Sequence, residues 1–211
     1  MMGEVNLNGK TVRYRVKVKP VRYVTIRILE DGTLLVTTPD ERIVERVLIE
    51  KRKWIISKLE IVEEALTQGK KGFPLFGEFI EVDGDPGELR EEIREQLRAK
   101  VKEIVDEVSP RIGTRPKRIY IIPMKNKWGT ATWRKSITIN LASAALPHNL
   151  LHYLVTHELA HLIEMRHSKK FWSIVSKFHP DYKEKRRELK KWWFIVHANE
   201  LWRTILRWPE V

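Results

Sequence analysis

The sequence contains no cysteine, so neither disulfides nor thiolate metal ligands are available to the protein. Any metal site must therefore use histidine nitrogens and carboxylate oxygens. No apolar run approaches the length of a membrane span, because even the C-terminal tail is broken by His197, Asn199 and Glu200. The first ten residues are polar and lack the apolar region of a signal peptide. We therefore expect a soluble, cytoplasmic protein without a membrane partner.

Composition bounds the size of the core and the kind of partner. The 211 residues can form one domain with a substantial core or two small domains. Forty Lys and Arg residues against 28 Asp and Glu residues give a formal net charge of +12, which would attract nucleic acids, nucleotides or acidic peptides. A chain with 32% charged residues and no cysteine also resembles a thermophile surface, so composition leaves both interpretations open.

The most informative stretch is 154–163, which contains a His-Glu-x-x-His motif. His157 and His161 are four residues apart, so on a helix they lie on one face, as two nitrogen ligands of one metal ion require. Glu158 points elsewhere and is placed to hold a water molecule rather than the metal. The other residues of this stretch are uncharged, which predicts a buried helix. This is the arrangement of zinc peptidases.

A hydrogen-bonded polar cluster in the core is the alternative interpretation of these three side chains. Burying three titratable groups without a strong partner is costly, however, and coordination of a metal ion removes that cost. We therefore predict that His157 and His161 bind a metal ion and that Glu158 is the catalytic base.

A third ligand is predicted at His167, six residues beyond His161. An unbroken helix would turn His167 about 240° away from the motif histidines, so the helix must end first. Ser168 supplies the reason, because it is a good N-cap for a second helix with apolar residues at 171, 174, 175 and 178. The alternatives for the third ligand are the carboxylates of Glu164, Glu184, Glu188 and Glu200.

The remaining pattern predicts an α+β fold. We expect residues 1–83 to form a small, mainly antiparallel β domain with a helix. Its strands lie within residues 5–38, its helix begins near Asp40 and ends at 68–72, and a strand pair at 73–82 extends the sheet. The breaker cluster Asp-Gly-Asp-Pro-Gly at 83–87 marks the domain boundary.

Residues 84–194 are predicted to form a zincin-like catalytic domain, in which a three-stranded sheet and helices accompany the motif helix. A helix is expected at 88–108, stopped by Pro110 and Gly113, followed by strands at 118–122, 127–133 and 136–141, and Pro147 begins the motif helix. An extended peptide could pair with an edge strand beside that helix. Residues 195–211 are predicted as a tryptophan-rich helical extension.

Three further sets of residues have more than one interpretation. The alternating cations of the second strand could bind a phosphate backbone or form a solvated face: Arg13, Arg15, Lys17 and Lys19. The C-terminal tryptophans could cover a cleft, bind a partner or stack on bases, although packing on the catalytic domain is the commoner fate: Trp192, Trp193, Trp202 and Trp208. Four histidines lack ligand spacing and are predicted to be structural or exposed: His148, His152, His179 and His197.

Several short motifs occur in a fixed order along the chain. They are Lys-Asn-Lys-Trp-Gly-Thr at 125–130, Ile-Asn-Leu at 139–141, His-Glu-Leu-Ala-His at 157–161, His-Ser at 167–168 with Phe-Trp at 171–172, and Pro-Asp-Tyr at 180–182 with Arg186. In order and spacing they strongly resemble the YgjP-like family of predicted metal-dependent hydrolases. With the N-terminal segment 25–39, the likeness covers roughly residues 11–192.

The resemblance implies a chemistry, because this family is related to the SprT-like and Wss1-like zinc metallopeptidases. It implies three histidine ligands and a glutamate base, which match His157, His161, His167 and Glu158, and a Zn²⁺ cofactor, although another divalent metal could serve. The family commonly has Trp-Gly-Ser-Cys where this chain has Trp-Gly-Thr-Ala at 128–131. Any role that needs the thiol is therefore absent, and the metal site is unaffected.

The leading functional prediction is a zinc-dependent metallopeptidase acting on a peptide or protein, including proteins attached to DNA as for some relatives. One alternative is a nucleoside triphosphate (UTP) pyrophosphohydrolase, an activity linked to the YgjP-like branch, although no glycine loop that would cradle a phosphate is visible. The other is a non-catalytic nucleic-acid or partner-binding module with a structural metal, which Glu158 argues against. The oligomeric state is not predictable from the sequence.

Substrate contacts are predicted on two segments. The segment 126–130 is expected to form a wall of the cleft, where Gly129 allows close backbone approach, although a tight sheet turn is the alternative. Its residues are Asn126, Lys127, Trp128, Gly129 and Thr130. The candidates for stabilising the oxyanion are Lys127, Arg134 and Tyr153.

Overall fold

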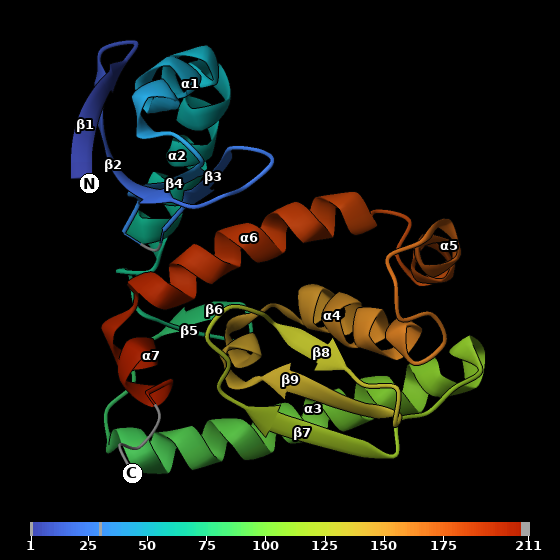
Figure 1. The fold of residues 1–211 in the computed structure, drawn as a ribbon. Helices are drawn as coiled ribbons and strands as arrows, with labels where there is room; N and C mark the ends of the chain where they lie inside the picture. The colour runs from blue at the N-terminus through green and yellow to red at the C-terminus, as the bar shows by residue number, and fades with distance from the viewer. Residues whose placement is uncertain (1, 30, 208–211) are drawn as a thin grey trace. The chain divides into compact units, whose positions relative to one another are not determined.

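The structure, a computed structural model, describes residues 2–29 and 31–207 (Figure 1). Packing divides the chain into two compact units, Met1–Gln68 and Gly69–Val211. Helices and strands occur in both units, so the predicted α+β class is confirmed. None of the described helices is long and apolar enough to cross a bilayer. Trp208, one of the four tail tryptophans, lies outside the described residues.

The first unit contains a four-stranded sheet with the order β1-β2-β4-β3. Its strands are β1 (Met2–Leu7), β2 (Lys10–Val18), β3 (Thr25–Ile28) and β4 (Leu34–Thr38). Asn8 and Gly9 both have positive φ, as the tight turn of the β1–β2 hairpin requires. The β1–β2 and β3–β4 pairs are antiparallel, but β2 and β4 pair in parallel. The antiparallel prediction is wrong for this central pair, because alternation of apolar residues fixes the buried face and not the partner strand.

Two helices and one 3₁₀ turn follow this sheet. They are η1 (Glu41–Ile43), α1 (Val44–Glu50) and α2 (Arg52–Gln68). The Asp40 carboxylate accepts a hydrogen bond from the backbone N–H of Arg42 at 3.0 Å, as expected of an N-cap. Ile55 and Leu59 of α2 are buried in one cluster with Leu7 and Leu34 of the sheet. This core belongs entirely to the first unit.

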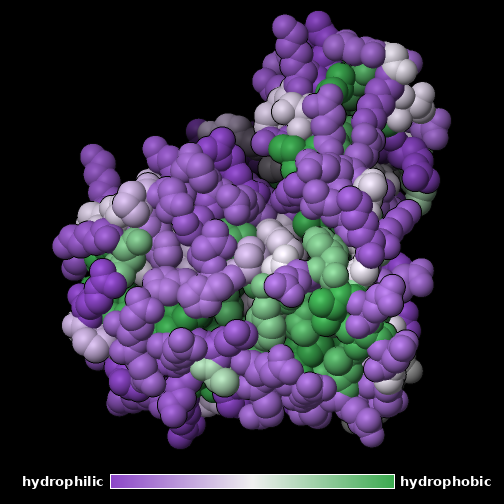
Figure 2. Space-filling view, turned by 180° about the vertical axis from the view of Figure 1, so that it is seen from behind, coloured by the Kyte–Doolittle hydropathy of each residue, from purple (hydrophilic) through white to green (hydrophobic). Residues whose placement is uncertain are grey.

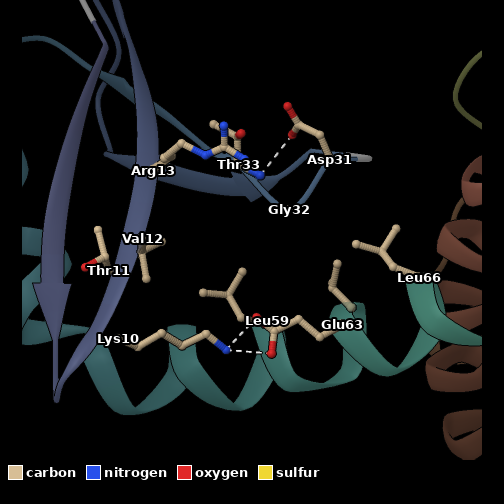
Figure 3. Close-up of a pocket in the computed structure, with 11 residues that line it drawn as sticks. Lys10, Thr11, Val12, Arg13, Asp31, Gly32, Thr33, Leu59, Glu63 and Leu66 are labelled. Atoms are coloured by element: carbon tan, nitrogen blue, oxygen red, sulfur yellow. Dashed lines mark hydrogen bonds and ion pairs between the residues drawn. The ribbon is translucent and has the colours of Figure 1, made fainter.

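A hollow of about 250 Å³ lies between β2, the turn at Gly32 and α2 (Figure 3). Among the described lining residues, three of the four charged side chains, those of Lys10, Asp31 and Glu63, have partners within the unit. The Lys10 ammonium lies 2.6 Å from the Glu63 carboxylate, and Asp31 accepts a hydrogen bond from the Thr33 N–H at 2.9 Å. The hollow contains no histidine and no group of metal ligands within the described residues. It is therefore a poor candidate for a catalytic site.

The second unit begins with a two-stranded sheet of β5 (Phe73–Leu75) and β6 (Glu78–Ile80). The prediction that this pair extends the first sheet is wrong. Its turn has positive φ at Phe76 and Gly77, whose N–H groups donate to the carbonyls of Ala144 and Ala145. A Cβ on Gly77 would lie 2.7 Å from that of Pro147, so the turn fits closely against the start of the motif helix. These bonds hold the pair within the second unit, and the limits 1–83, 84–194 and 195–211 stay a prediction.

The longest helix is α3 (Pro86–Ile112). The Asp85 side chain caps its N-terminus, and Gly113, in the left-handed conformation at φ 79°, caps its C-terminus. The helix is longer than the predicted 88–108, because Pro110 lies inside its last turns instead of ending it. Ile93, Leu97 and the apolar residues that follow them at helical spacing are buried in the main core.

The sheet of the second unit has the order β7-β9-β8. Strand β7 (Arg118–Ile122) pairs in parallel with β9 (Ser136–Asn140), and β8 (Gly129–Ala131) pairs with β9 in antiparallel fashion. Strand β8 is shorter than the predicted 127–133, since the residues before it form a loop. The chain continues through η2 (Leu141–Ala145), α4 (His148–His161), α5 (Lys169–Phe178), α6 (Tyr182–Ala198) and α7 (Glu200–Ile205).

The described tail tryptophans pack within the second unit. Trp202 is fully buried, its ring stacks on Phe73 at a centroid distance of 5.0 Å, and its Nε1–H donates to the Pro74 carbonyl at 2.8 Å. Trp192 stacks on Phe79 at 6.1 Å. The face of the molecule seen in Figure 2 is mostly hydrophilic, with hydrophobic side chains gathered in limited areas. The tail thus adds to the core of this unit.

Candidate metal centre and cleft

Helix α4 is the buried helix that carries the His-Glu-x-x-His motif (Figure 1). Pro147 precedes its first turn, and nearly every residue from 150 to 160 is buried. The rings of His157 and His161 lie side by side, with centroids 4.9 Å apart. The motif thus presents both imidazoles on one face, as its spacing predicts.

The predicted helix break before Ser168 is confirmed. Helix α4 ends at His161, and the Ser168 hydroxyl accepts a hydrogen bond from the Phe171 N–H at 3.3 Å, which starts α5. The loop between the helices turns His167 back toward the motif. Its Nε2 lies 3.0 Å from Nε2 of His157, and the ligand atoms of the three histidines all lie within 4.8 Å of one another.

Neighbouring groups hold the three rings in place. Nδ1 of His161 donates a hydrogen bond to the Glu164 carbonyl oxygen at 3.2 Å, which leaves Nε2 of His161 available to a metal. The ring of Phe171 contacts the rings of His157, His161 and His167 at centroid distances of 4.8, 4.4 and 4.8 Å. Phe171 therefore forms an apolar support under the whole group.

None of the alternative carboxylates joins this group within the described residues. The side chain of Glu164 accepts a hydrogen bond from the Arg166 N–H, Glu184 pairs with Arg187, and Glu200 pairs with Arg203. Glu188 is exposed on α6. The structure thus brings together the three histidines and no carboxylate ligand.

Burial keeps the three imidazoles neutral. It lowers the pKa of His157 to about 3, with smaller contributions from His161, His167 and Arg186. Burial also lowers the pKa of His161 and of His167. Neutral imidazoles offer lone pairs at neutral pH, and three of them make a donor set that fits zinc or a similar divalent metal.

Glu158 is the buried acid of the site, with 4% of its surface exposed. Burial raises its pKa to about 8, against a smaller opposite effect of Lys127, and its Oε2 atom has no hydrogen-bond partner among the described residues. The carboxylate lies directly against β8, because a Cβ on Gly129 would be only 2.7 Å from Oε1. Gly129 thus allows the strand to approach the carboxylate.

Two further buried polar atoms near Glu158 lack partners among the described residues. They are Nδ1 of His157 and the hydroxyl of Tyr153. The ring of Tyr153 lies 5.9 Å from that of His157, and burial raises the Tyr153 pKa to about 12, so the hydroxyl stays protonated and can donate. Buried polar groups are normally hydrogen-bonded, so this concentration of unpaired atoms marks a ligand site.

His157, His167 and Glu158 line a cleft of about 320 Å³, and the ring of His161 lies behind it against His157 and His167. Its lining residues are Lys127, Trp128, Gly129, Tyr153, Leu154, His157, Glu158, His167, Arg186, Leu189 and Lys190. Four predicted substrate contacts are among them: Lys127, Trp128, Gly129 and Tyr153. The other three predicted contacts do not line the cleft: Asn126, Thr130 and Arg134. Arg134 follows β8, with its guanidinium over the ring of Trp133.

The cleft residues of α6 were not among the predicted substrate contacts. Arg186, Leu189 and Lys190 are spaced so that they share one face of a helix. Arg186 belongs to one of the motifs that carry the family resemblance, but that motif gave it no role. The spacing of Arg186, Leu189 and Lys190 along one face of a helix was the feature of the sequence that could have identified them.

A single buried side chain holds the loop that forms the opposite wall. Nδ2 of Asn140 donates to the carbonyls of Met124 and Lys127 at 2.9 and 2.8 Å. Its Oδ1 accepts from the N–H groups of Met124 and Ala142, both at 3.1 Å. The indole N–H of Trp128 donates to the carbonyl of Leu189 at 3.2 Å, which ties the loop to α6. The loop that lines the cleft is therefore held by hydrogen bonds to Asn140 and to α6.

A sequence model of the YgjP-like family, metallopeptidase domain, matches residues 84–192, just over half of the 211 residues. The chain belongs to the YgjP-like family. The matched part of this YgjP-like protein includes the three histidines, Glu158 and Arg186. It therefore contains a metallopeptidase domain, and its chemistry is that of a metal-dependent peptidase in general.

Two solved structures of metallopeptidase zymogens are similar to part of the YgjP-like chain. Abylysin of Pyrococcus abyssi is 26% identical, with a TM-score of 0.40 over 42% of this chain and 90% of the abylysin chain. Jannalysin of Methanocaldococcus jannaschii is 24% identical, with a TM-score of 0.39 over 43% of this chain and 94% of the jannalysin chain. No curated protein matches the chain.

Proposed function

We propose that the protein is a zinc-dependent metallopeptidase, with His157, His161 and His167 as metal ligands and Glu158 as the general base. One observation carries this proposal: a buried carboxylate with an unpaired oxygen adjoins three imidazoles whose ligand atoms lie within 4.8 Å of one another. A structural metal site has no use for such a carboxylate. Membership of a family with a metallopeptidase domain supports the same class of reaction.

The metal ion and the side chains of the protein would have separate roles in the reaction. A divalent ion held by the three histidines would polarise the scissile carbonyl and lower the pKa of a water molecule toward about 7. The positive charge nearby would lower the pKa of Glu158, so that its carboxylate is ionised and can accept the proton of that water. The water oxygen would form a bond to the scissile carbonyl carbon, and Glu158 would then deliver the proton to the amine nitrogen as the C–N bond breaks.

Substrate would be held by β8 and by a donor in the cleft, in a zincin-like arrangement. In the order β7-β9-β8, strand β8 pairs only with β9 among the described strands, so its other edge is available to an extended peptide. The protonated hydroxyl of Tyr153 and the ammonium of Lys127 are the donors best placed for the oxyanion, since both line the cleft. Arg134 does not line it.

A second candidate is hydrolysis of a nucleoside triphosphate such as UTP. The cations Lys127, Arg186 and Lys190 in the cleft favour it, because they could neutralise phosphate oxygens. The buried carboxylate of Glu158 and the edge of β8 left unpaired by the described strands favour amide hydrolysis. We therefore place the peptidase first and the nucleotide hydrolase second.

A parallel assay separates these functions. Purified protein with one equivalent of Zn²⁺ is incubated with casein, with a protein bound to DNA and with UTP, and Glu158→Gln protein is the control. Cleavage of protein substrates by the wild type alone supports the proposal. Hydrolysis of UTP alone would establish the second candidate. No hydrolysis of any substrate by metal-loaded protein would favour a binding module with a structural metal.

A further inference from the structure

The cleft is lined by more cationic than acidic side chains. Three of its lining residues are cations, Lys127, Arg186 and Lys190, and Glu158 is the acid among them. Glu158 is buried, interacts electrostatically with Lys127 and is assigned to proton transfer, and no other described lining residue is an acid that could neutralise Arg186 and Lys190. A substrate that brings its own negative charge would therefore fit this cleft better than a neutral one.

Arg186 is the cation whose position is fixed relative to the metal ligands. Its guanidinium lies 4.8 Å from the ring centroid of Trp172. Trp172 in turn stacks on His167 at 5.4 Å and on Tyr182 at 4.8 Å, with interplanar angles of 20° and 19°. This stack holds the guanidinium beside one of the three histidines, where cation–π contact stabilises it.

The guanidinium of Arg186 makes no ion pair in the described part of the chain, although both neighbours do. Lys185 pairs with Asp181, and Arg187 pairs with Glu184 at 2.6 Å. Asp181 and Glu184 are thus engaged by the residues on either side of Arg186. Its planar fork of donors remains available to a ligand in the cleft.

We propose that Arg186 is a specificity residue that binds a substrate carboxylate next to the scissile peptide bond. This inference rests on the proposed peptidase function. A planar guanidinium matches a planar carboxylate through two parallel hydrogen bonds, whereas an ammonium binds as a point charge. The carboxylate can belong to an acidic side chain or to the C-terminus of the peptide. The apolar residues Trp128, Leu154 and Leu189 line the same cleft and suit the rest of a peptide.

The test uses a peptide that the wild-type protein cleaves, chosen from the products of casein digestion. Versions of it carry Glu or Gln on each side of the cleaved bond, and each version has a free or an amidated C-terminus. Steady-state kinetics are measured for wild type, Arg186→Gln, Arg186→Lys and the matched control Arg187→Gln. Arg187 lies one residue away, pairs with Glu184 and does not line the cleft.

For the preferred acidic peptide, we expect Arg186→Gln to raise KM by about 10- to 100-fold, as the loss of a charge-assisted hydrogen bond predicts. For the matched neutral peptide, KM should change less than about threefold. Arg186→Lys should restore only part of the preference, and Arg187→Gln should behave as wild type. The Glu-to-Gln pairs and the amidated peptides identify which carboxylate is bound.

Three results would overturn the inference. One is an equal loss of activity on acidic and neutral peptides, which would make Arg186 a structural support for Trp172. Another is cleavage of peptides by the wild type without any preference for a carboxylate, which leaves the peptidase proposal intact. The third is an effect of Arg186→Gln on UTP hydrolysis only. By contrast, absence of peptide cleavage by metal-loaded wild type would refute the proposed function itself.

Discussion

Replacing Glu158 with glutamine separates its catalytic role from a structural one. Glutamine has the same shape but cannot accept the proton from water. Loss of a general base lowers turnover by about 10²- to 10⁴-fold. Peptide cleavage by Glu158→Gln should therefore fall at least about 100-fold, while the metal content stays at one equivalent per chain. Glu184→Gln, which alters a carboxylate paired with Arg187 on the surface of α6, should keep full activity.

The same substitution should stabilise the metal-free protein. Burial raises the pKa of Glu158 from 4.5 to about 8. An acid with a raised pKa favours the folded state below the unfolded pKa, and this stability is lost as pH rises from 4.5 toward 8. At pH 7 the loss is on the order of 3 kcal/mol, from about 1.4 kcal/mol per pH unit. Glutamine does not ionise, so the variant avoids this loss.

Urea unfolding of chelator-treated protein at pH 4.5 and pH 7 measures this difference. We expect the two proteins to be nearly equally stable at pH 4.5 and the variant to be more stable at pH 7. A variant that is less stable at both pH values would indicate that Glu158 is a bonded member of a polar core cluster. A variant that retains turnover would contradict its assignment as the base.

Three other predictions follow from the geometry of the site and its surroundings. Gly129→Ala should lower activity by more than about 10-fold without unfolding the protein, because the new Cβ would lie 2.7 Å from Oε1 of Glu158 and would displace that carboxylate. Gly87→Ala, in the first turn of α3, should leave activity unchanged in the same assay. Asn140→Ala should lower the free energy of unfolding by about 3 kcal/mol in urea titrations, because it removes the four hydrogen bonds by which this buried side chain holds the loop. A decrease of less than about 1 kcal/mol would show that the loop does not depend on Asn140. Burial and the nearby His152 lower the pKa of His179 to about 4. The contribution of His179 to the free energy of unfolding, on the order of 3 kcal/mol, is therefore present above the unfolded pKa of 6.5 and is lost as pH falls toward 4. A His179→Gln variant whose unfolding shows the same acid dependence as wild type would contradict this.

The grouping of the three histidines was predictable because its signals are local. The spacing of His157 and His161 fixes their shared face on a helix, and Ser168 ends one helix by capping the next. These effects depend on a few neighbouring residues, so they can be seen in the sequence. Whether the three histidines bind a metal and whether Glu158 acts as the base remain predictions.

The walls of the cleft were less predictable because they depend on contacts between distant segments. Trp128 and Leu189 meet through a hydrogen bond between residues 61 positions apart. Arg186 reaches the cleft only because α6 packs beside the motif helix, which no local pattern specifies. The same limit explains the parallel pairing of β2 with β4 and the separate β5–β6 sheet, since partner choice for a strand is set by packing of the whole unit.

The central claim is that His157, His161 and His167 hold one metal ion that peptide hydrolysis requires. Stepwise addition of Zn²⁺ to chelator-treated protein, with bound metal and peptide cleavage measured on the same samples, tests it most directly. We predict that cleavage rises in proportion to bound metal and saturates at one equivalent, and that His161→Ala protein neither binds zinc tightly nor gains activity. Peptide cleavage that is independent of bound zinc, or full zinc binding by His161→Ala protein, would contradict the account.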